Sequence, residues 1–230
     1  MKLGATLQRI RSSFENSVGT IVFGMEDGTV SIFGLIFGVA ATTSSAKTVL
    51  IAGASGAAAA AVSMMAGAYL DIETTRDEAN AARASSTSAP GSPFSLASRL
   101  AKAGLTAAQS QALAAAMQNS PDAVDGLMHA LQGVPQAAQL NPSEQALWML
   151  LADFLAAAVP ILPFVFVPVA QARVVSGVVT TALLVGLGVG RAQIKKRNPI
   201  RTVLETVSIG IAAAIAGVAI GLLVNYLFAE

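Results

Sequence analysis

Five stretches of this sequence are each long and apolar enough to cross a lipid bilayer, and this constrains the fold more than any other feature. They cover residues 18–41, 49–70, 146–169, 174–190 and 203–228. A helix needs roughly 20 mostly apolar residues to span the hydrocarbon core. Charged residues make up only 12% of the chain, about half their usual share in soluble domains. We therefore predict an all-α integral membrane protein with five transmembrane helices.

Basic residues gather on alternate sides of these spans, which predicts the orientation. Only Lys47 and Arg173 lie in the short links after the first and third spans. The segments before the first span and between the fourth and fifth hold Lys2, Arg9, Arg11, Arg191, Lys195, Lys196, Arg197 and Arg201. Cytoplasmic loops carry the excess of Lys and Arg, so we expect a cytoplasmic N-terminus and an outside C-terminus. The compact chain shows no targeting signal, which favours a bacterial plasma membrane.

A polar insert separates the second span from the third. We predict three regions: 1–70, with an amphipathic N-terminal helix and two spans; 71–145, a cytoplasmic helical subdomain; and 146–230, with three spans. The insert begins as a helical continuation of the second span. Apolar residues at helical spacing then predict two or three short helices, separated near Gly104 and near Ser120-Pro121.

Several classes of function are disfavoured by the composition and by missing motifs. The net charge is +1 and no basic stripe with interleaved aromatic residues is present, so we expect no nucleic-acid partner. Phosphate-binding glycine loops, Ser-His-Asp arrangements and HExxH are absent, and we predict that the chain is not an enzyme and has no cofactor.

The run "FGMEDGTVSIFGLIFGV" places Glu26 and Asp27 inside the first apolar span. A charge there costs at least a few kcal/mol and normally faces a bundle interior, a water-filled path or a bound cation. Asp27 is therefore our candidate cation ligand that also exchanges protons, unless it lies at the interface, bonded to a helix terminus. Glu26 points about 100° away on a helix, so it either flanks the path or pairs with Arg9 or Arg11.

Further candidates lie in the second and third spans and in the insert. Met64 is a soft thioether ligand suited to transition metals, or else packs in the membrane as we expect Met65 to do. Glu73 and Asp77 share a helical face and form either an oxygen-lined metal entrance or a solvated surface. Asp153 either relays protons or bonds a Ser or Thr on a neighbouring helix. A last candidate set, close to one helix face, is Asp122, Asp125 and His129.

"IVFGMEDGTVS" and "VLIAGASGAAAAAVSMMAGAYL" together resemble the vacuolar iron transporter family, which pairs Asp-Gly in the first span with Ser-Met, Gly and Tyr in the second. "NP" at Asn141-Pro142 and "PILPF" in the third span are also similar. The resemblance implies a homodimer that exports Fe²⁺, and other divalent metals such as Mn²⁺, from the cytosol in exchange for protons. It also implies that Asp27 and Met64 are membrane ligands beside the partner's first span.

Three departures from the family pattern leave an alternative open. Relatives carry a glutamate where this chain has Gly56, and many carry Gly-Glu-Tyr where it has Gly67-Ala68-Tyr69. The insert is also poor in the glutamates usual in the family. A member with fewer ligands could be a non-transporting scaffold or metal sensor. Retention of Asp27 argues against that alternative, because replacing a membrane carboxylate would stabilise a bundle that transports nothing.

Overall fold

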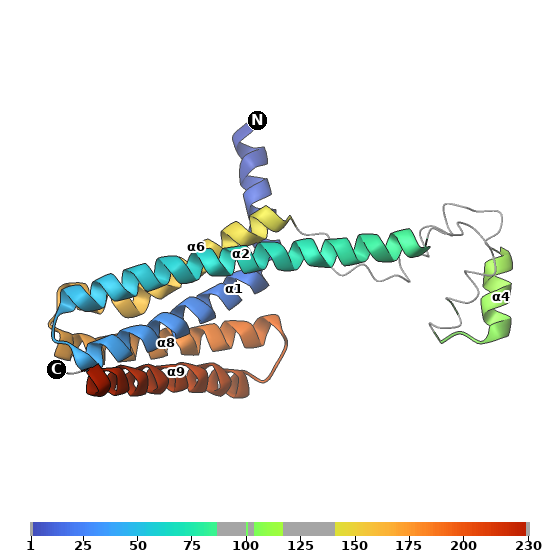
Figure 1. Cartoon of the computed structure of the whole chain (residues 1–230). Helices are drawn as coiled ribbons and strands as arrows, with labels where there is room; N and C mark the ends of the chain where they lie inside the picture. The colour runs from blue at the N-terminus through green and yellow to red at the C-terminus, as the bar shows by residue number, and fades with distance from the viewer. Residues whose placement is uncertain (1, 87–99, 101–103, 117–140, 229–230) are drawn as a thin grey trace. The chain divides into compact units, whose positions relative to one another are not determined.

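The computed structural model describes residues 2–86, 100, 104–116 and 141–228, and the described part consists of helices and their links (Figure 1). Five helices are long and apolar enough to cross a membrane, which confirms the predicted all-α class with five transmembrane helices. In chain order the helices are α1 (Lys2–Thr42), α2 (Ala46–Ser86), α4 (Ala107–Ala116), α6 (Pro142–Ile161), α7 (Pro163–Phe166), α8 (Val169–Ile194) and α9 (Pro199–Phe228).

The chain divides into two compact units, Met1–Tyr69 with Pro142–Glu230, and Leu70–Asn141. The first unit is a helix bundle arranged around α1, which contacts α6, α8 and α9. Its apolar core joins α1, α2, α6, α7 and α8 through Ile32, Ile36, Ala40, Val49, Ala57, Ala157, Phe164, Val169 and Ala172.

The N-terminal segment does not form a helix of its own. It is continuous with the first span in α1, which runs without interruption from Lys2 to Thr42. Figure 1 shows its first turns projecting beyond the bundle. The end of this projection is fixed to the start of α6: Trp148 donates from Nε1 to Ser13 Oγ at 3.1 Å, and its ring meets Phe14 edge-on at 5.4 Å between centroids.

Glycines allow α1 and α9 to touch backbone to backbone. A Cβ built at Gly34 would lie 2.8 Å from the carbonyl oxygen of Ala213, and one at Gly217 would overlap the Gly34 carbonyl. One turn later, Gly38 meets Gly217 and Gly221 in the same way. Both helices thus carry a Gly-x-x-x-Gly pair at the contact, as expected where the solvent is lipid and close packing replaces the hydrophobic effect.

The prolines of the third span break it into two helices. Pro160 lies inside α6, which ends at Ile161, and the short α7 begins at Pro163. The carbonyl of Pro160 accepts a 2.8 Å hydrogen bond from the Ser176 hydroxyl of α8. A polar partner therefore satisfies a carbonyl at the break, which a membrane-embedded backbone requires.

The described residues of the second unit agree with the predicted helix break at Gly104. This glycine has a φ of +99°, a conformation that L side chains rarely adopt. Thr106 then caps α4 reciprocally with Gln109: the Gln109 amide N–H donates to Thr106 Oγ1 at 3.3 Å, and the Thr106 N–H donates to Gln109 Oε1 at 3.1 Å. The predicted break at Ser120-Pro121 lies outside the described residues.

We expect Gly217→Ala to lower the stability of the bundle by about 1–3 kcal/mol, the usual cost of overpacking, because the new methyl group overlaps the Gly34 carbonyl. Thermal unfolding of the purified protein in detergent measures this effect. Gly186→Ala on α8 is the matched control, since nothing lies within 4 Å of its Cβ. An equal loss of stability in both variants would contradict the proposed α1–α9 contact.

Candidate metal site in the membrane-spanning helices

Asp27 lies in the membrane-spanning part of α1, on a face that no other described helix fully covers. Its side chain is half-buried between exposed Phe23 and exposed Ser31, which lie one turn away on either side. In the part of the chain that the structure describes, no hydrogen-bond donor or basic group contacts its carboxylate. Asp27 therefore combines a membrane position with free ligand capacity at the surface of the protomer.

A second carboxylate, Asp153 of α6, lies beside Asp27. A Cβ built at Gly28 would overlap the backbone carbonyl of Asp153, so the absence of a side chain at Gly28 brings the two helices into contact at this level. Asp153 is fully buried, and the charge of Asp27 is close enough to act on it. The structure thus brings together two carboxylates that are 126 positions apart in the sequence.

Neither side-chain oxygen of Asp153 has a hydrogen-bond partner among the described residues. This overturns the expectation that Asp153 bonds a Ser or Thr on a neighbouring helix. Thr29 of α1 donates to the Met25 carbonyl, and Ser176 of α8 donates to the Pro160 carbonyl. Periodicity could not reveal this pair, but the small residues Gly28 and Ala152 beside the two aspartates are a signal that their helices approach closely.

Glu26 points away from Asp27, toward α8 and α9. Its carboxylate pairs with the guanidinium of Arg191 at 3.2 Å and accepts a 3.3 Å hydrogen bond from the Thr206 hydroxyl. The alternative that Glu26 pairs with Arg9 or Arg11 is wrong for Arg11, which pairs with Glu15 at 2.9 Å. The side chain of Arg9 is not described. Because α1 is continuous helix between them, Arg11 lies about 22 Å from Glu26 measured along the helix.

Met64 lies on α2 at about the depth of Asp27. Gly56 of α2 faces Ile32 and Leu35 of the antiparallel α1, and eight residues farther along a helix is about 12 Å. The same distance back along α1 leads from these two residues to positions 24–27. Met64 and Met65 are both partly exposed, so burial alone does not distinguish the ligand candidate from its neighbour.

Side chains of α1 occupy the space beside Gly56 of α2. A Cβ built there would meet the end of the Leu35 side chain and come within 3.4 Å of Ile32. Leu35 therefore occupies the space into which a longer residue at position 56 would extend. Gly56 therefore lies directly against Leu35 and Ile32 of α1.

Glu73 and Asp77 lie on the part of α2 that belongs to the second unit. Glu73 is half-buried and Asp77 is exposed, and Arg76 between them has an interaction of its own. Within the described residues, no three His, Asp or Glu side chains form a cluster able to hold a metal. Asp122, Asp125 and His129 lie outside those residues, so the entrance and the His129 set stay predictions.

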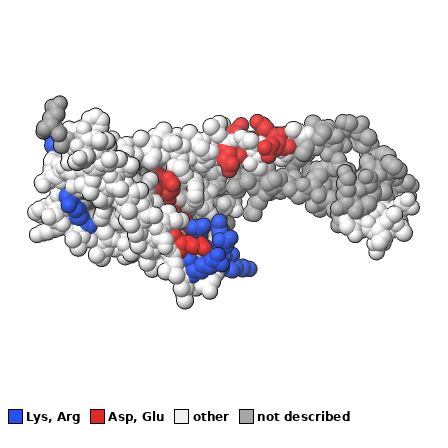
Figure 2. All heavy atoms as spheres, turned by 60° about the horizontal axis from the view of Figure 1, so that its bottom comes forward, with Lys and Arg blue, Asp and Glu red and all other residues white. Residues whose placement is uncertain are grey.

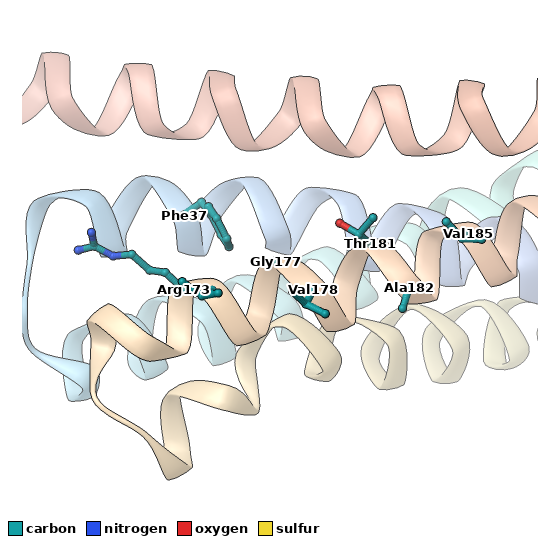
Figure 3. A pocket seen from close by; sticks show the side chains of 8 residues that line it. Phe37, Arg173, Gly177, Val178, Thr181, Ala182 and Val185 are labelled. Carbon is teal, nitrogen blue, oxygen red and sulfur yellow. The ribbon is translucent and has the colours of Figure 1, made fainter.

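A hollow between α1 and α8 is unsuited to a cation (Figure 3). Its lining is apolar apart from Thr181 and Arg173, and includes Phe37 and Val178. The guanidinium of Arg173 donates to the carbonyl of Ala40 in the last turn of α1, where a positive charge favours the helix dipole. This hollow is therefore lined by one positively charged side chain and no carboxylate, so it would repel a cation.

Basic side chains gather at one end of the bundle, with acidic side chains beside them (Figure 2). The link between α8 and α9 supplies exposed Lys195, Lys196 and Arg197. This link lies at the end where α1 enters the bundle, since Glu26 of α1 reaches Arg191 at the end of α8. The N-terminal and α8–α9 basic segments are therefore on the same side, as the alternation of five spans requires.

Comparison with known proteins gives consistent similarities over most of the chain. The model of the VIT family matches residues 18–222. The chain is 28% identical to "Vacuolar iron transporter" from Centaurea cyanus over 87% of its own length and 84% of that protein. It is also 28% identical to "Vacuolar iron transporter 1" from Eucalyptus grandis, over 86% and 83% respectively, and 26% identical to "Vacuolar iron transporter 1" from Arabidopsis thaliana, over 91% and 86%.

We expect Arg191→Met to destabilise the bundle by about 1–3 kcal/mol, because it leaves the largely buried carboxylate of Glu26 without its ion-pair partner. Adding Glu26→Gln should recover part of the loss. Arg201→Met is the matched control, since the Arg201–Glu205 pair is largely exposed and is worth at most about 1 kcal/mol. Equal unfolding temperatures for Arg191→Met and Arg201→Met would rule out a stabilising role for the Glu26–Arg191 pair.

Proposed function

The chain belongs to the VIT family, and from this premise we propose that it is an iron transporter that exports Fe²⁺ from the cytosol in exchange for protons. The relatives it matches are named vacuolar iron transporters, and a transporter rather than an enzyme agrees with the apolar helix bundle. Mn²⁺ is proposed as a second substrate, because carboxylate oxygens bind both metals. The transported metal is the substrate; no resident cofactor is proposed.

The observation that carries this proposal is the Asp27 carboxylate, which lies in a membrane-spanning helix without a donor among the described residues. A structural carboxylate in such a place would be paired, as Glu26 is with Arg191. An unpaired one is stabilised by a cation that visits it. In the proposed cycle, ionised Asp27 and the Met64 sulfur bind the metal from the cytosolic side. Protonation of Asp27 from the opposite side then weakens binding and releases the metal.

We propose that the functional unit is a homodimer with the metal path beside α1 of each protomer. Two observations support this. Asp27 lies on the outer face of α1, flanked by exposed Phe23 and Leu35, and one protomer has no cluster of three ligands among its described residues. A second copy against this face would add ligands and cover the exposed apolar side chains.

The proposed orientation places the N-terminus in the cytoplasm and the C-terminus outside. It is supported by the basic side chains at the end of the bundle where α1 enters, since cytoplasmic segments are enriched in Lys and Arg. That the membrane is a bacterial plasma membrane stays a prediction; the relatives named above are plant proteins called vacuolar. Glu26, Glu73 and Asp77 are proposed to flank the path or collect metal at its entrance.

We expect proteoliposomes with an imposed pH gradient to take up Fe²⁺ when they contain the wild-type protein. Asp27→Asn should abolish this flux, because the amide keeps the shape of the side chain but loses the charge that binds the metal. Metal uptake measured with an internal fluorescent chelator, for Fe²⁺, Mn²⁺ and Zn²⁺ in turn, checks the prediction. If the folded wild-type dimer moves none of these metals faster than protein-free vesicles, the scaffold or sensor alternative is favoured instead.

Met64→Leu should raise the Fe²⁺ concentration needed for half-maximal flux several-fold, because leucine fills a similar volume but has no sulfur ligand. The neighbouring Met65→Leu is the control and should leave the flux unchanged. Initial rates across a range of Fe²⁺ concentrations measure both. Identical curves for the two variants would assign Met64 to packing.

A further inference from the structure

Asp153 is a buried charge-bearing group to which the proposed cycle gives no part. It is fully buried in the first unit, and both of its side-chain oxygens lack a donor in the described part of the chain. Buried polar groups are almost always hydrogen-bonded, and each exception requires an explanation. A bundle in lipid would be more stable with an apolar residue at this position, so the carboxylate of Asp153 needs a function.

The two arginines of α8 already have partners and do not neutralise Asp153. Arg191 pairs with Glu26, and Arg173 lies near the other end of α8, where it donates to the Ala40 carbonyl. Asp27, the residue before Gly28, lies at the contact of α1 with the Asp153 backbone and has the same sign of charge. Two adjacent carboxylates in apolar surroundings repel each other unless a cation lies between them.

We propose that Asp27 and Asp153 of the same protomer together bind the transported divalent cation, with Asp153 as its second carboxylate ligand. This inference rests on the proposed function and adds a ligand from the third membrane-spanning helix. Within one protomer, two carboxylates and one divalent cation sum to zero charge, whereas Asp27 alone would leave a net positive charge on that protomer's site. Neutral complexes are much less costly to hold in lipid than charged ones.

The backbone geometry supports two ligands at one level of the membrane. Gly28 lets the backbone of Asp153 reach α1 directly after Asp27, and Gly24, one turn earlier, lies against Met149 and Ala152 of α6. Neither side-chain oxygen of Asp153 has a hydrogen-bond partner among the described residues, so its carboxylate has free ligand capacity, and oxygen ligands of this kind suit Mn²⁺ and Fe²⁺.

The test is direct metal binding by the full-length protein in lipid nanodiscs, measured by calorimetry with Mn²⁺, Zn²⁺ and, without oxygen, Fe²⁺. Asp153→Asn should weaken binding of the preferred metal at least ten-fold, about 1.4 kcal/mol, and Asp153→Ala should do the same. Both variants should unfold at or above the wild-type temperature without metal, because a buried unpaired carboxylate has been removed. They should also lose most of the rise in unfolding temperature that metal gives the wild type.

Glu144→Gln is the matched control, since it removes a carboxylate from the same helix at its first turn and should leave metal affinity unchanged. Wild-type affinity in both Asp153 variants, with binding lost in Asp27→Asn, would overturn this inference and leave the proposed function intact. A wild-type protein that binds none of the three metals would also overturn it. Ten-fold weaker binding in the Asp153 variants, combined with no wild-type flux, would support the two-carboxylate site and reject transport.

Discussion

The bundle depends on how closely its neighbours approach α1. Lipid is as apolar as leucine, so the hydrophobic effect does little to hold one membrane helix against another. Contact must come from dispersion between closely packed atoms and from polar groups that find partners. Gly28 lets α6 reach the backbone of α1, and Gly34 and Gly38 do the same for α9. Hydrogen bonds of Gln145 with Ser17 and Thr20, at 2.7 Å each, complete the α1–α6 contact.

The same helix carries carboxylates in two different electrostatic states. Glu26 is held by Arg191 and Thr206, so its charge is balanced within the bundle. Asp27, its neighbour in sequence, is half-buried beside the α1–α6 contact at Gly28, where the described residues supply no balancing charge. The 100° rotation between successive residues of a helix thus separates a structural carboxylate from one with free ligand capacity. This contrast is the physical basis for assigning transport to Asp27 rather than to Glu26.

Sequence patterns predicted the spans well because length and hydropathy are local properties. The all-helical class, the five spans and the turn at Gly104 all follow from residues within one segment. The partners of individual side chains could not be predicted in this way. Glu26 meets Arg191 across 165 positions, and the rotation of each helix about its axis decides such contacts. Alternation of the spans did imply that the end of the fourth lies level with the start of the first, so this pair was accessible in principle.

The contact between the first and the last helix has a consequence for biogenesis. A membrane protein emerges from the ribosome one span at a time, and α1 enters the bilayer before α9. The glycine face of α1 that receives Ala213, Gly217 and Gly221 is therefore exposed to lipid until α9 has been made. Until then α1 can pack only on α2, α6 and α8. A chain truncated before α9 would leave the glycine face of α1 without its partner helix. The order of synthesis thus makes α9 the element that completes the packing around α1.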